Sequence, residues 1–345
     1  LVTAGPDRVD LPCQHRLEGC GGCDWQHLAV PSQLAAKAEI VRDAMRRTGR
    51  LPHAEIHLGR SVPAQGYRTT IRLVGDADGR AAYRQERSHD TVPASGCLVA
   101  HPNLLPVIDT VAISPGTEVT LRTSVATGAV AARWDAATGT VDGLPSSVEV
   151  GAQAVLHEVV AGHRLQVSAG SFFQSGPAAA ELLVDAVRRA APELEGAERV
   201  VDLYAGVGLF VVAAAPDAGH VVTVETSRSA VADCHANLAG RSARVEQGQV
   251  GRWRPDRGMA VDVVIADPAR SGLGKPGTAT IVAAAAPVAV LVSCDPVALA
   301  RDTALLVRQG YRHDGTEVLD LFPHTHHVEC VTRFVADRHD PARTT

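Results

Sequence analysis

The residues best suited to chemistry lie where predicted strands end in the second half of the chain. Cys294 follows the apolar run VAVLVS and precedes a helix that begins at Pro296. Because the N-terminus of a helix favours a thiolate, Cys294 is a candidate nucleophile. The alternative is an inert core thiol, which is common for a lone cysteine in an apolar strand. Glu329, in the last predicted strand, is a candidate general base, with a surface carboxylate as the alternative.

A glycine-containing turn and three strand-end acids indicate the kind of ligand. Gly206 and Gly208 lie in DLYAGVGLF after Asp202, and Glu225 and Asp267 end later strands. A nicotinamide fingerprint would read GxGxxG, and an acid before the glycines would repel a pyrophosphate. An acid there suits a cationic or amine-bearing ligand, and Glu225 suits a ribose diol. The pattern favours S-adenosylmethionine over a dinucleotide, with an unliganded tight turn as the alternative.

A second group of chemically able residues is the cysteine-rich stretch CQHRLEGCGGCDW, which holds Cys13, Cys20 and Cys23. Seven cysteines without a secretory signal argue for a reducing compartment and against a disulfide framework. One local fourth ligand is missing, and Cys97 is the remaining candidate. From the residues alone, zinc and an iron–sulfur cluster are equally open. The other two cysteines, on a predicted helix and inside a strand, are interpreted as core residues: Cys234 and Cys330.

The elements that must position the strand-end residues follow from hydrophobic periodicity. Helices are predicted over 178–190, 228–239, 278–286 and 296–309, and they alternate with apolar strands. This alternation predicts an α/β fold with a parallel sheet wound on both sides and an antiparallel last strand. Ligands in such sheets bind beyond the carboxyl ends of the strands, so Asp267 and Cys294 are expected to face the same crevice.

The first half of the chain has a different pattern. A helix with the apolar stripe Leu34, Ala38, Val41 and Met45 follows the cysteine stretch and stops at Gly49. Short alternating strands separated by turn residues then run from about 52 to 172, which predicts a β-rich domain.

Length, charge and hydropathy limit the classes of protein to which the chain can belong. The 345 residues suggest about two domains, and the formal net charge of −5 is not typical of a general nucleic-acid binder. Residues 37–87 nevertheless form a local basic region, with eleven Lys and Arg against six Asp and Glu. No apolar run is long enough to cross a bilayer and the sequence shows no signal-peptide pattern, so we expect a cytoplasmic protein without a membrane partner. Because the chain begins at Leu1, we expect that a segment upstream is missing.

Five ordered segments carry a family resemblance: SFFQ, DLYAGVGLF, DPARSG, VSCDPVALARD and FPHTHHVE. They resemble the successive motifs of the RNA 5-methyluridine methyltransferases, the uracil-C5 methyltransferases of ribosomal and transfer RNA, over about residues 8 to 335. The resemblance implies a class I S-adenosylmethionine-dependent methyltransferase fold. It also implies that Cys294 adds to C6 of a target uracil and that Glu329 takes the C5 proton. Further positions that it assigns to the cofactor or the target base are Gln174, Tyr204, Gly206, Gly208, Leu209, Glu225, Gln249 and Asp267.

This chemistry agrees with the residue types. Uracil C5 is a poor nucleophile, but thiolate addition at C6 creates an enolate that can attack a sulfonium methyl. The base must leave its stack to reach the site, and Phe172 is a plausible stacking partner. One departure from the family pattern is Asp295 after the nucleophile, where Asn is commoner. An ionised carboxylate close to the thiol would raise the pKa of Cys294 and slow its attack.

The resemblance also decides between the two metals. The branch that methylates ribosomal RNA has the same three-plus-one cysteine pattern and binds a 4Fe–4S cluster. This implies that Cys13, Cys20, Cys23 and Cys97 hold a structural cluster, and that 23S ribosomal RNA is the first candidate substrate, with transfer RNA as the alternative. That branch often has an RNA-binding β-barrel in front. Three arginines are candidate phosphate contacts, although exposed strand arginines are more often solvated: Arg68, Arg72 and Arg84.

We therefore expect an iron–sulfur segment with its helix over 1–50, an RNA-facing β-rich domain over 51–175, a catalytic domain over 176–337 and a tail over 338–345. We expect a monomer without an obligate protein partner. Two other classes remain as alternatives: a non-catalytic iron–sulfur or zinc RNA-binding protein with a degenerate methyltransferase domain, and a dinucleotide-dependent oxidoreductase.

Overall fold

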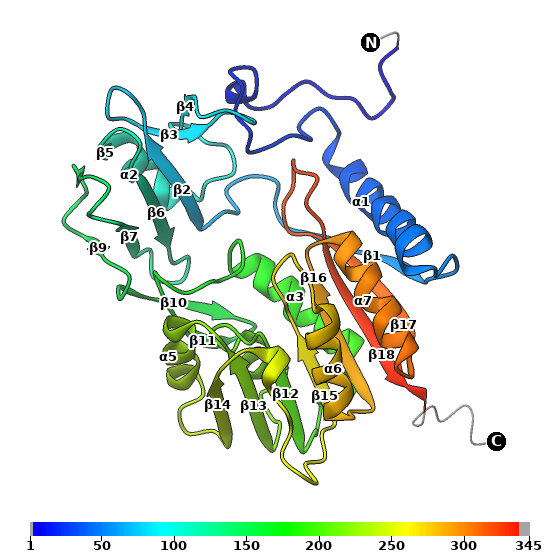
Figure 1. Cartoon of the computed structure of the whole chain (residues 1–345). Coiled ribbons are helices and arrows are strands. Elements are labelled where there is room, and N and C mark those ends of the chain that lie inside the picture. The colour runs from blue at the N-terminus through cyan, green and yellow to red at the C-terminus, as the bar shows by residue number, and fades with distance from the viewer. Residues whose placement is uncertain (1–2, 338–345) are drawn as a thin grey trace.

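The fold was analysed in a computed structural model, which describes residues 3–337. The tail predicted over 338–345 lies outside the described residues. The second half of the chain forms most of a large twisted sheet with helices on both faces, and the β-rich part lies to one side of that layer (Figure 1).

The main sheet has eight strands, and seven of them run parallel to one another. The exception, β18, is antiparallel to both neighbours, β16 and β17. The predicted parallel sheet with an antiparallel last strand is therefore confirmed. In spatial order the strands are β1 (Ile56–Ser61), β17 (Tyr311–Asp320), β18 (Glu329–Ala336), β16 (Val288–Ser293), β15 (Val263–Ala266), β12 (Arg199–Leu203), β13 (His220–Glu225) and β14 (Ala243–Gln247).

Two apolar layers cover the sheet because consecutive strand residues point to opposite faces. On β12, Val200 belongs to one layer and Val201 to the other. The first layer contains α3 (Pro177–Ala190), α4 (Leu209–Ala213) and α5 (Arg228–Asn237). The second contains α1 (Val30–Ala44), its continuation η2 (Met45–Gly49), α6 (Gly274–Ala284) and α7 (Pro296–Arg308).

Strand β1 differs from the sequence-based expectation. It lies in the range assigned to the β-rich domain, yet it pairs in parallel with β17 and extends the main sheet. Its sequence IHLGRS has little apolar character, so its own pattern does not indicate which sheet it joins. Helix α1 packs over this edge, so residues from the N-terminal part complete the catalytic layer.

The β-rich part contains the strands that the alternating patterns predicted. Its six-stranded sheet is antiparallel except for the β7–β9 pair. In spatial order it comprises β4 (Thr91–Pro93), β3 (Ala81–Arg84), β2 (Thr70–Gly75), β6 (Glu118–Thr123), β7 (Val130–Trp134) and β9 (Val148–Val150). Two small pairs complete it: β5 (Ala112–Ile113) with β8 (Val141–Asp142), and the hairpin of β10 (Val155–Val160) and β11 (His163–Ser168).

Five short helices lie in the connections between these elements: η1 (Gln14–Arg16), η3 (Pro102–Leu104), α2 (Leu105–Thr110), η4 (Pro192–Leu194) and η5 (Val250–Arg252). Across residues 3–337, no helix has both the length and the apolar character that crossing a membrane requires.

Candidate functional site

Three predicted site residues meet at the carboxyl edge of the main sheet. Ser293 of β16 pairs with Cys330 of β18, so Cys294 and Glu329 lie at the same end of two adjacent strands. Asp267 directly follows β15, which is paired with β16. The Glu329 and Asp267 carboxyl groups both raise the pKa of the Cys294 thiol, which places the three side chains within electrostatic reach of one another.

Burial raises the pKa values of the three ionisable groups in this site. It is the main cause that raises the pKa of Cys294, to about 11, and that of Asp267, to about 7. Burial and then the Asp267 carboxyl raise the pKa of Glu329 well above its usual range. Burial therefore opposes the stabilisation of a Cys294 thiolate that the helix N-terminus was expected to provide.

The concern about Asp295 is also corrected by the structure. Asp295 is the N-cap of α7, and its side-chain oxygen accepts the N–H of Ala298 at 2.7 Å. It stabilises the helix start rather than opposing the thiol. The acids that raise the pKa of Cys294 are Glu329 and Asp267 instead.

Arg270 is a site residue that the sequence reasoning missed. Its guanidinium lowers the pKa of both Cys294 and Glu329, opposing the effect of burial. The side chain is exposed and donates towards Nε2 of His327 at 3.5 Å. Its position three residues after Asp267 in DPARSG was the available signal, since that segment was already identified as a motif.

The glycine turn after β12 is fixed by the acid at the end of the neighbouring strand. Glu225 accepts the N–H groups of Gly206 at 3.0 Å, Thr226 at 2.7 Å and Ser227 at 2.8 Å. Gly206 and Gly208 both have positive φ, and no atom lies within 4 Å of the point where a Cβ on Gly206 would stand. The turn is therefore rigid and leaves open space above Gly206.

Asp202, beneath this turn, is a buried acid with little compensation for its charge. Neither of its carboxyl oxygens accepts a hydrogen bond of normal geometry among the described residues, and the nearby Val211 N–H lowers its pKa only in part. Burial raises its pKa well above the usual value, and the Asp267 and Glu225 carboxyls raise it further. Three acids therefore share one region, and a positively charged ligand there would relieve their mutual repulsion.

The other predicted cofactor positions differ in how deeply their side chains are buried. Gln174 is buried and donates from Nε2 to Asp267 at 3.2 Å, which places it in the site. Leu209 is buried at the start of α4. The Tyr204 hydroxyl points towards α6, close to Gly277. Gln249 is exposed at the start of η5, and its backbone carbonyl accepts hydrogen bonds from that turn.

Phe172 stands out among the predicted substrate contacts because 70% of its surface is exposed, whereas the adjacent Phe173 is buried. An exposed ring of this size is available for stacking. Arg68 is half-buried, with its guanidinium 5.8 Å from the Tyr67 ring and 5.9 Å from the Phe322 ring.

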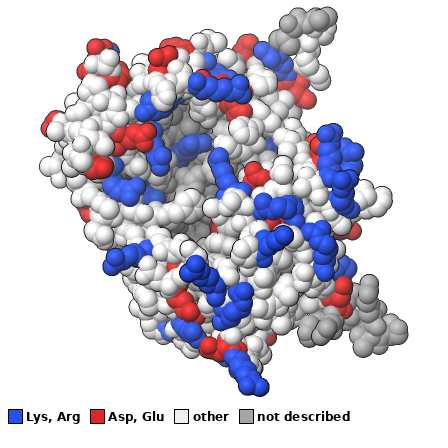
Figure 2. Space-filling model, in the orientation of Figure 1, with Lys and Arg blue, Asp and Glu red and all other residues white. Residues whose placement is uncertain are grey.

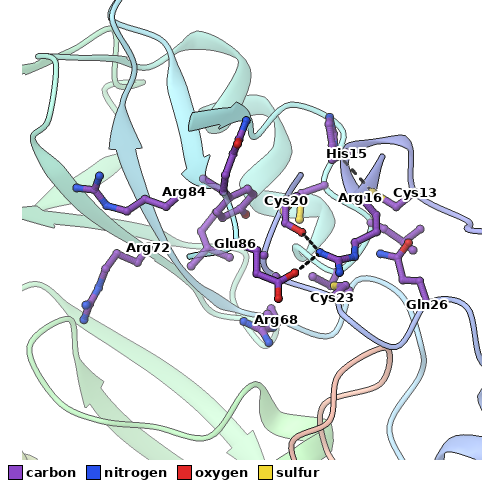
Figure 3. Close-up of a pocket in the computed structure, with 18 of the residues that line it drawn as sticks. Cys13, His15, Arg16, Cys20, Cys23, Gln26, Arg68, Arg72, Arg84 and Glu86 are labelled. Atoms are coloured by element: carbon purple, nitrogen blue, oxygen red, sulfur yellow. Dashed lines mark hydrogen bonds and ion pairs between the residues drawn. The ribbon is translucent and has the colours of Figure 1, made fainter. Parts of the chain in front are cut away.

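The predicted metal ligands Cys13, Cys20, Cys23 and Cys97 all line one cavity of about 630 Å³. Figure 3 shows the first three on the N-terminal segment, beside the strands that carry Arg72 and Arg84. All four thiols are free. Two contacts hold the segment against the β-rich part. The backbones of Cys20 and Gln85 form an isolated antiparallel β-bridge, and the Arg16 guanidinium lies 2.9 Å from the Glu86 carboxylate.

These four cysteines share the cavity without forming a single-ion site. Among the described residues, no three His, Cys, Asp or Glu side chains are close enough together to hold one metal ion. Burial is the main cause that raises the pKa of Cys20, and it raises that of Cys23 to about 11. Cys234 and Cys330 are fully buried, as predicted for core residues.

Part of the basic region lines this cavity. Its contribution is Arg68, Arg72, Arg84 and Arg87, and Arg16 from the N-terminal segment joins them. Figure 2 shows a hollow on this face with Lys and Arg side chains on its walls and rim. The local basic region predicted from the sequence therefore forms part of a concave surface, although the formal net charge of the chain is −5.

The histidine-rich loop before β18 is a bonded turn. Asp24 accepts the N–H of His326 at 3.2 Å and contacts its Nδ1 at 2.8 Å. The His324 carbonyl accepts the N–H of Trp25 at 2.8 Å. These bonds make the loop a hydrogen-bonded turn, and among the described residues no three metal-ligating side chains gather at it.

Comparison with known proteins agrees with this geometry. An uncharacterized RNA methyltransferase of Streptomyces avermitilis is 33% identical over 377 aligned positions, covering 96% of this chain and 84% of the relative. One from Streptomyces coelicolor is 34% identical, with 96% and 80% covered. No protein-family model matches the chain.

A solved structure with a similar fold is the Pyrococcus abyssi tRNA (uracil-54, C5)-methyltransferase in complex with S-adenosyl-L-homocysteine. It superimposes with a TM-score of 0.73 over 97% of this chain and 88% of that one, at 23% identity. The shared fold defines the class, an α/β protein built like the S-adenosylmethionine-dependent methyltransferases. The identity and coverage of the Streptomyces relatives show that the chain belongs to the RNA methyltransferase family.

Proposed function

We propose that this protein forms 5-methyluridine in RNA, using S-adenosylmethionine as the methyl donor. The observation that carries the proposal is the meeting of Cys294 and Glu329 at adjacent strand ends, with Asp267 on the next strand. A methyltransferase that acts on a more nucleophilic atom would not need a thiol and a carboxyl group placed together.

The residues around the glycine turn fit the proposed cofactor. The buried Asp202 carboxyl lies among the charges of Glu225 and Asp267, a setting that suits a sulfonium and an ammonium group. The open space above Gly206 leaves room for a ligand against the backbone. When bound, S-adenosylmethionine supplies an electrophilic methyl group and a positive charge that lowers the pKa of the surrounding acids.

The reaction then rests on two side chains. Before the reaction, Cys294 and Glu329 lose their protons to solvent, because a positively charged ligand beside them lowers the pKa of both. The Cys294 sulfur then forms a bond to C6 of the uracil, and the C5–C6 π electrons shift to give an enolate. C5 takes the methyl group, and the bond from sulfonium sulfur to methyl breaks with its electron pair left on sulfur. The Glu329 carboxylate accepts the C5 proton, the C5–C6 double bond re-forms, and the Cys294 thiolate is expelled.

The target base must leave its stack to reach these groups, which are half-buried or buried. Phe172 is the proposed stacking partner because its ring is exposed two residues before Gln174, which bonds to Asp267. Arg68 and Arg72 are proposed phosphate contacts on the cavity wall.

A covalent trap tests the proposal. With RNA that contains 5-fluorouridine, C5 bears fluorine where the base needs a proton, so the Cys294 adduct is expected to accumulate and to be detected by mass spectrometry. Cys294→Ala is expected to abolish the adduct, and Cys234→Ala, which removes a buried thiol elsewhere, is expected to retain it. An undiminished adduct in Cys294→Ala would sink the nucleophile assignment.

For the substrate, we propose 23S ribosomal RNA, supported by the three-plus-one cysteine pattern that resembles the ribosomal branch. The fold likeness to a tRNA (uracil-54, C5)-methyltransferase supplies the competing substrate. Mapping 5-methyluridine in both RNA classes from a deletion strain separates them: loss from 23S ribosomal RNA alone is the expected result, and loss from transfer RNA alone contradicts it.

We further propose that Cys13, Cys20, Cys23 and Cys97 bind a 4Fe–4S cluster. The support is that the four free thiols line one cavity, in the three-plus-one arrangement that the family resemblance implies. Four thiolates can ligate either zinc or such a cluster, so the choice of the cluster rests on the resemblance. The cluster would act as a cross-link, since methyl transfer needs no electrons.

Anaerobic purification tests the cluster. A broad absorbance shoulder in the visible range, with about four iron and four sulfide per chain, is expected, as four thiolates ligate such a cluster. Cys97→Ser is expected to lose both, and Cys234→Ser, as a control, to keep them. Stoichiometric zinc without iron would overturn the choice of metal.

A further inference from the structure

The turn Ser168–Ser171 leads from β11 towards Phe172. On the side of the main sheet, one buried carboxylate accepts hydrogen bonds from this turn. Asp233 on α5 accepts the Ser168 N–H at 2.8 Å and the Ser168 hydroxyl at 2.7 Å. It also accepts the Ser171 hydroxyl at 2.5 Å and the Gln166 side-chain amide at 3.0 Å. Asp233 is fully buried, so all its bonds are made to protein groups.

On the side of the β-rich part, a buried guanidinium donates hydrogen bonds to the same turn. Arg122 on β6 donates to the carbonyl of Ser168 at 2.8 Å and to that of Ser171 at 2.7 Å. Its Nε also donates to the Thr70 hydroxyl at 3.0 Å. Burial lowers the pKa of Arg122 to about 10, which still leaves it charged at neutral pH. The two serines of the turn therefore donate to Asp233 of one half of the molecule, and their carbonyls accept from Arg122 of the other.

The turn has little freedom to adjust. A Cβ on Gly170 would lie 3.1 Å from the Ala152 carbonyl oxygen, so the backbone is closely packed there. Just beyond the turn, Thr69 N–H donates to the Ser175 carbonyl at 2.8 Å. Between these fixed points lie Phe172, whose exposed ring has few packing contacts of its own, and Gln174, which bonds to Asp267. The backbone thus fixes where Phe172 stands and the direction of its Cα–Cβ bond, from which the ring projects.

We propose that Asp233 and Arg122 are positioning residues that clamp the Ser168–Ser171 turn from opposite halves of the molecule, and so hold Phe172 against the target base. The inference rests on the proposed function, because it gives Phe172 a base to stack on. It adds two residues that neither contact the reacting atoms nor lie in the motifs found in the sequence.

The chemistry of the carboxylate makes Asp233→Asn a sharp test. Each Asp233 oxygen accepts two donors, Oδ1 from Gln166 and Ser168, and Oδ2 from Ser168 and Ser171. An asparagine of the same volume can keep part of these bonds, because serine hydroxyls also accept and the Gln166 amide can reverse, but it loses the negative charge that acts on Arg122 and strengthens all four bonds.

The experiment is a double-mutant cycle that follows the rate of adduct formation with 5-fluorouridine RNA. Asp233→Asn is expected to slow adduct formation about tenfold, because small misplacement of a positioning group is costly. In the Phe172→Ala background the same change is expected to cost less than about twofold, because residues that act through one another are not additive. Equal losses in both backgrounds would overturn the proposal, since they would reflect general damage.

Controls keep the outcomes separate. Asp262→Asn is the matched control, because Asp262 also accepts a backbone N–H, from Arg199 at 2.8 Å, at the opposite edge of the sheet. It is expected to leave the rate unchanged. If Asp233→Asn does not fold, Ser171→Ala removes one hydroxyl from the clamp, and the same non-additivity with Phe172→Ala is expected. No adduct in the wild-type protein refutes the proposed function itself, whereas an adduct with an additive cycle refutes only the clamp.

Discussion

Folding buries the Glu329 carboxyl group beside Asp267, where its negative charge is unfavourable. The folded protein keeps its proton at pH values where the unfolded chain, with a usual carboxyl pKa of 4.5, has lost it. The folded state therefore binds more protons, and this residue costs stability progressively as pH rises above that value. Such a cost is common where a residue is retained for chemistry rather than for stability.

Replacing Glu329 with Gln is expected to raise the thermal midpoint at pH 8 by several degrees, at about 2 to 4 °C per kcal/mol for a domain of this size. The gain is expected to shrink towards pH 5, where the unfolded chain also holds its proton. Differential scanning fluorimetry across this range measures it.

The control for that experiment is Glu149→Gln on β9, an exposed position where little change is expected at either pH. A midpoint that falls in Glu329→Gln, or that rises equally at pH 5 and pH 8, would contradict the interpretation.

The sequence could predict which strand-end residues meet, because parallel strands present their carboxyl ends at one edge. Asp267 and Cys294 were expected at one crevice in that way, whereas Glu329, at the start of the antiparallel β18, was proposed from its residue type and the family resemblance. It could not predict Arg270 as a modulator, since an exposed arginine has no periodic signal. Asp233 and Arg122 were missed for another reason: their partners lie 46 to 65 positions away in sequence, and a hydrogen bond over that distance leaves no local pattern.

At the level of elements, the loop between β17 and β18 depends on residues near the N-terminus. Gln33 accepts the N–H of His324 at 2.6 Å. Lys37, fully buried in α1, donates to the Phe322 carbonyl at 3.1 Å and to Asp320 at 2.6 Å. The Tyr67 hydroxyl donates to the Pro323 carbonyl at 3.1 Å. The backbone that leads into Glu329 is therefore held by the segment that follows the cysteines.

Lys37→Met is expected to destabilise the protein by about 3 to 5 kcal/mol, because it leaves the Asp320 carboxylate buried without its partner. Urea unfolding measures the loss. The double variant Lys37→Met/Asp320→Asn removes both charges and is expected to recover most of it. A single variant as stable as the wild type would show that the pair does not hold this loop.

The helical pattern of α1 was predicted correctly at Ala38, Val41 and Met45, which are fully buried. Lys37 lies among them and was not identified, because a lysine in an amphipathic pattern is normally assigned to the solvent face. Its partner Asp320 is 283 positions away, and only the folded chain brings the two together.

At the level of the whole molecule, charge is distributed unevenly. The cavity wall carries several arginines although the formal net charge is −5. Arg72 is exposed on this wall and forms no ion pair with the described residues. A surface of this kind can attract a polyanion locally while the rest of the molecule repels it.

Arg72→Ala is expected to weaken RNA binding and to reduce the slope of log affinity against log salt by about one, as the loss of one phosphate contact requires. Arg257→Ala, in the loop before β15 at the opposite edge of the sheet, is the control and is expected to keep the wild-type slope. Fluorescence anisotropy at several salt concentrations measures both. An unchanged slope in Arg72→Ala would remove this residue from the RNA surface.

The position of β1 in the main sheet has a consequence for biosynthesis. Ile56 pairs with Thr316, about 260 residues later in the chain. At the ribosomal rate of about 5 to 20 residues per second, β1 waits roughly 13 to 50 s for its partner strand to be made. During this interval its backbone donors and acceptors are open to other chains, a state in which strand edges aggregate. Completion of the catalytic layer is thus one of the last events in the formation of this protein, and a chain truncated before β17 would retain an open strand.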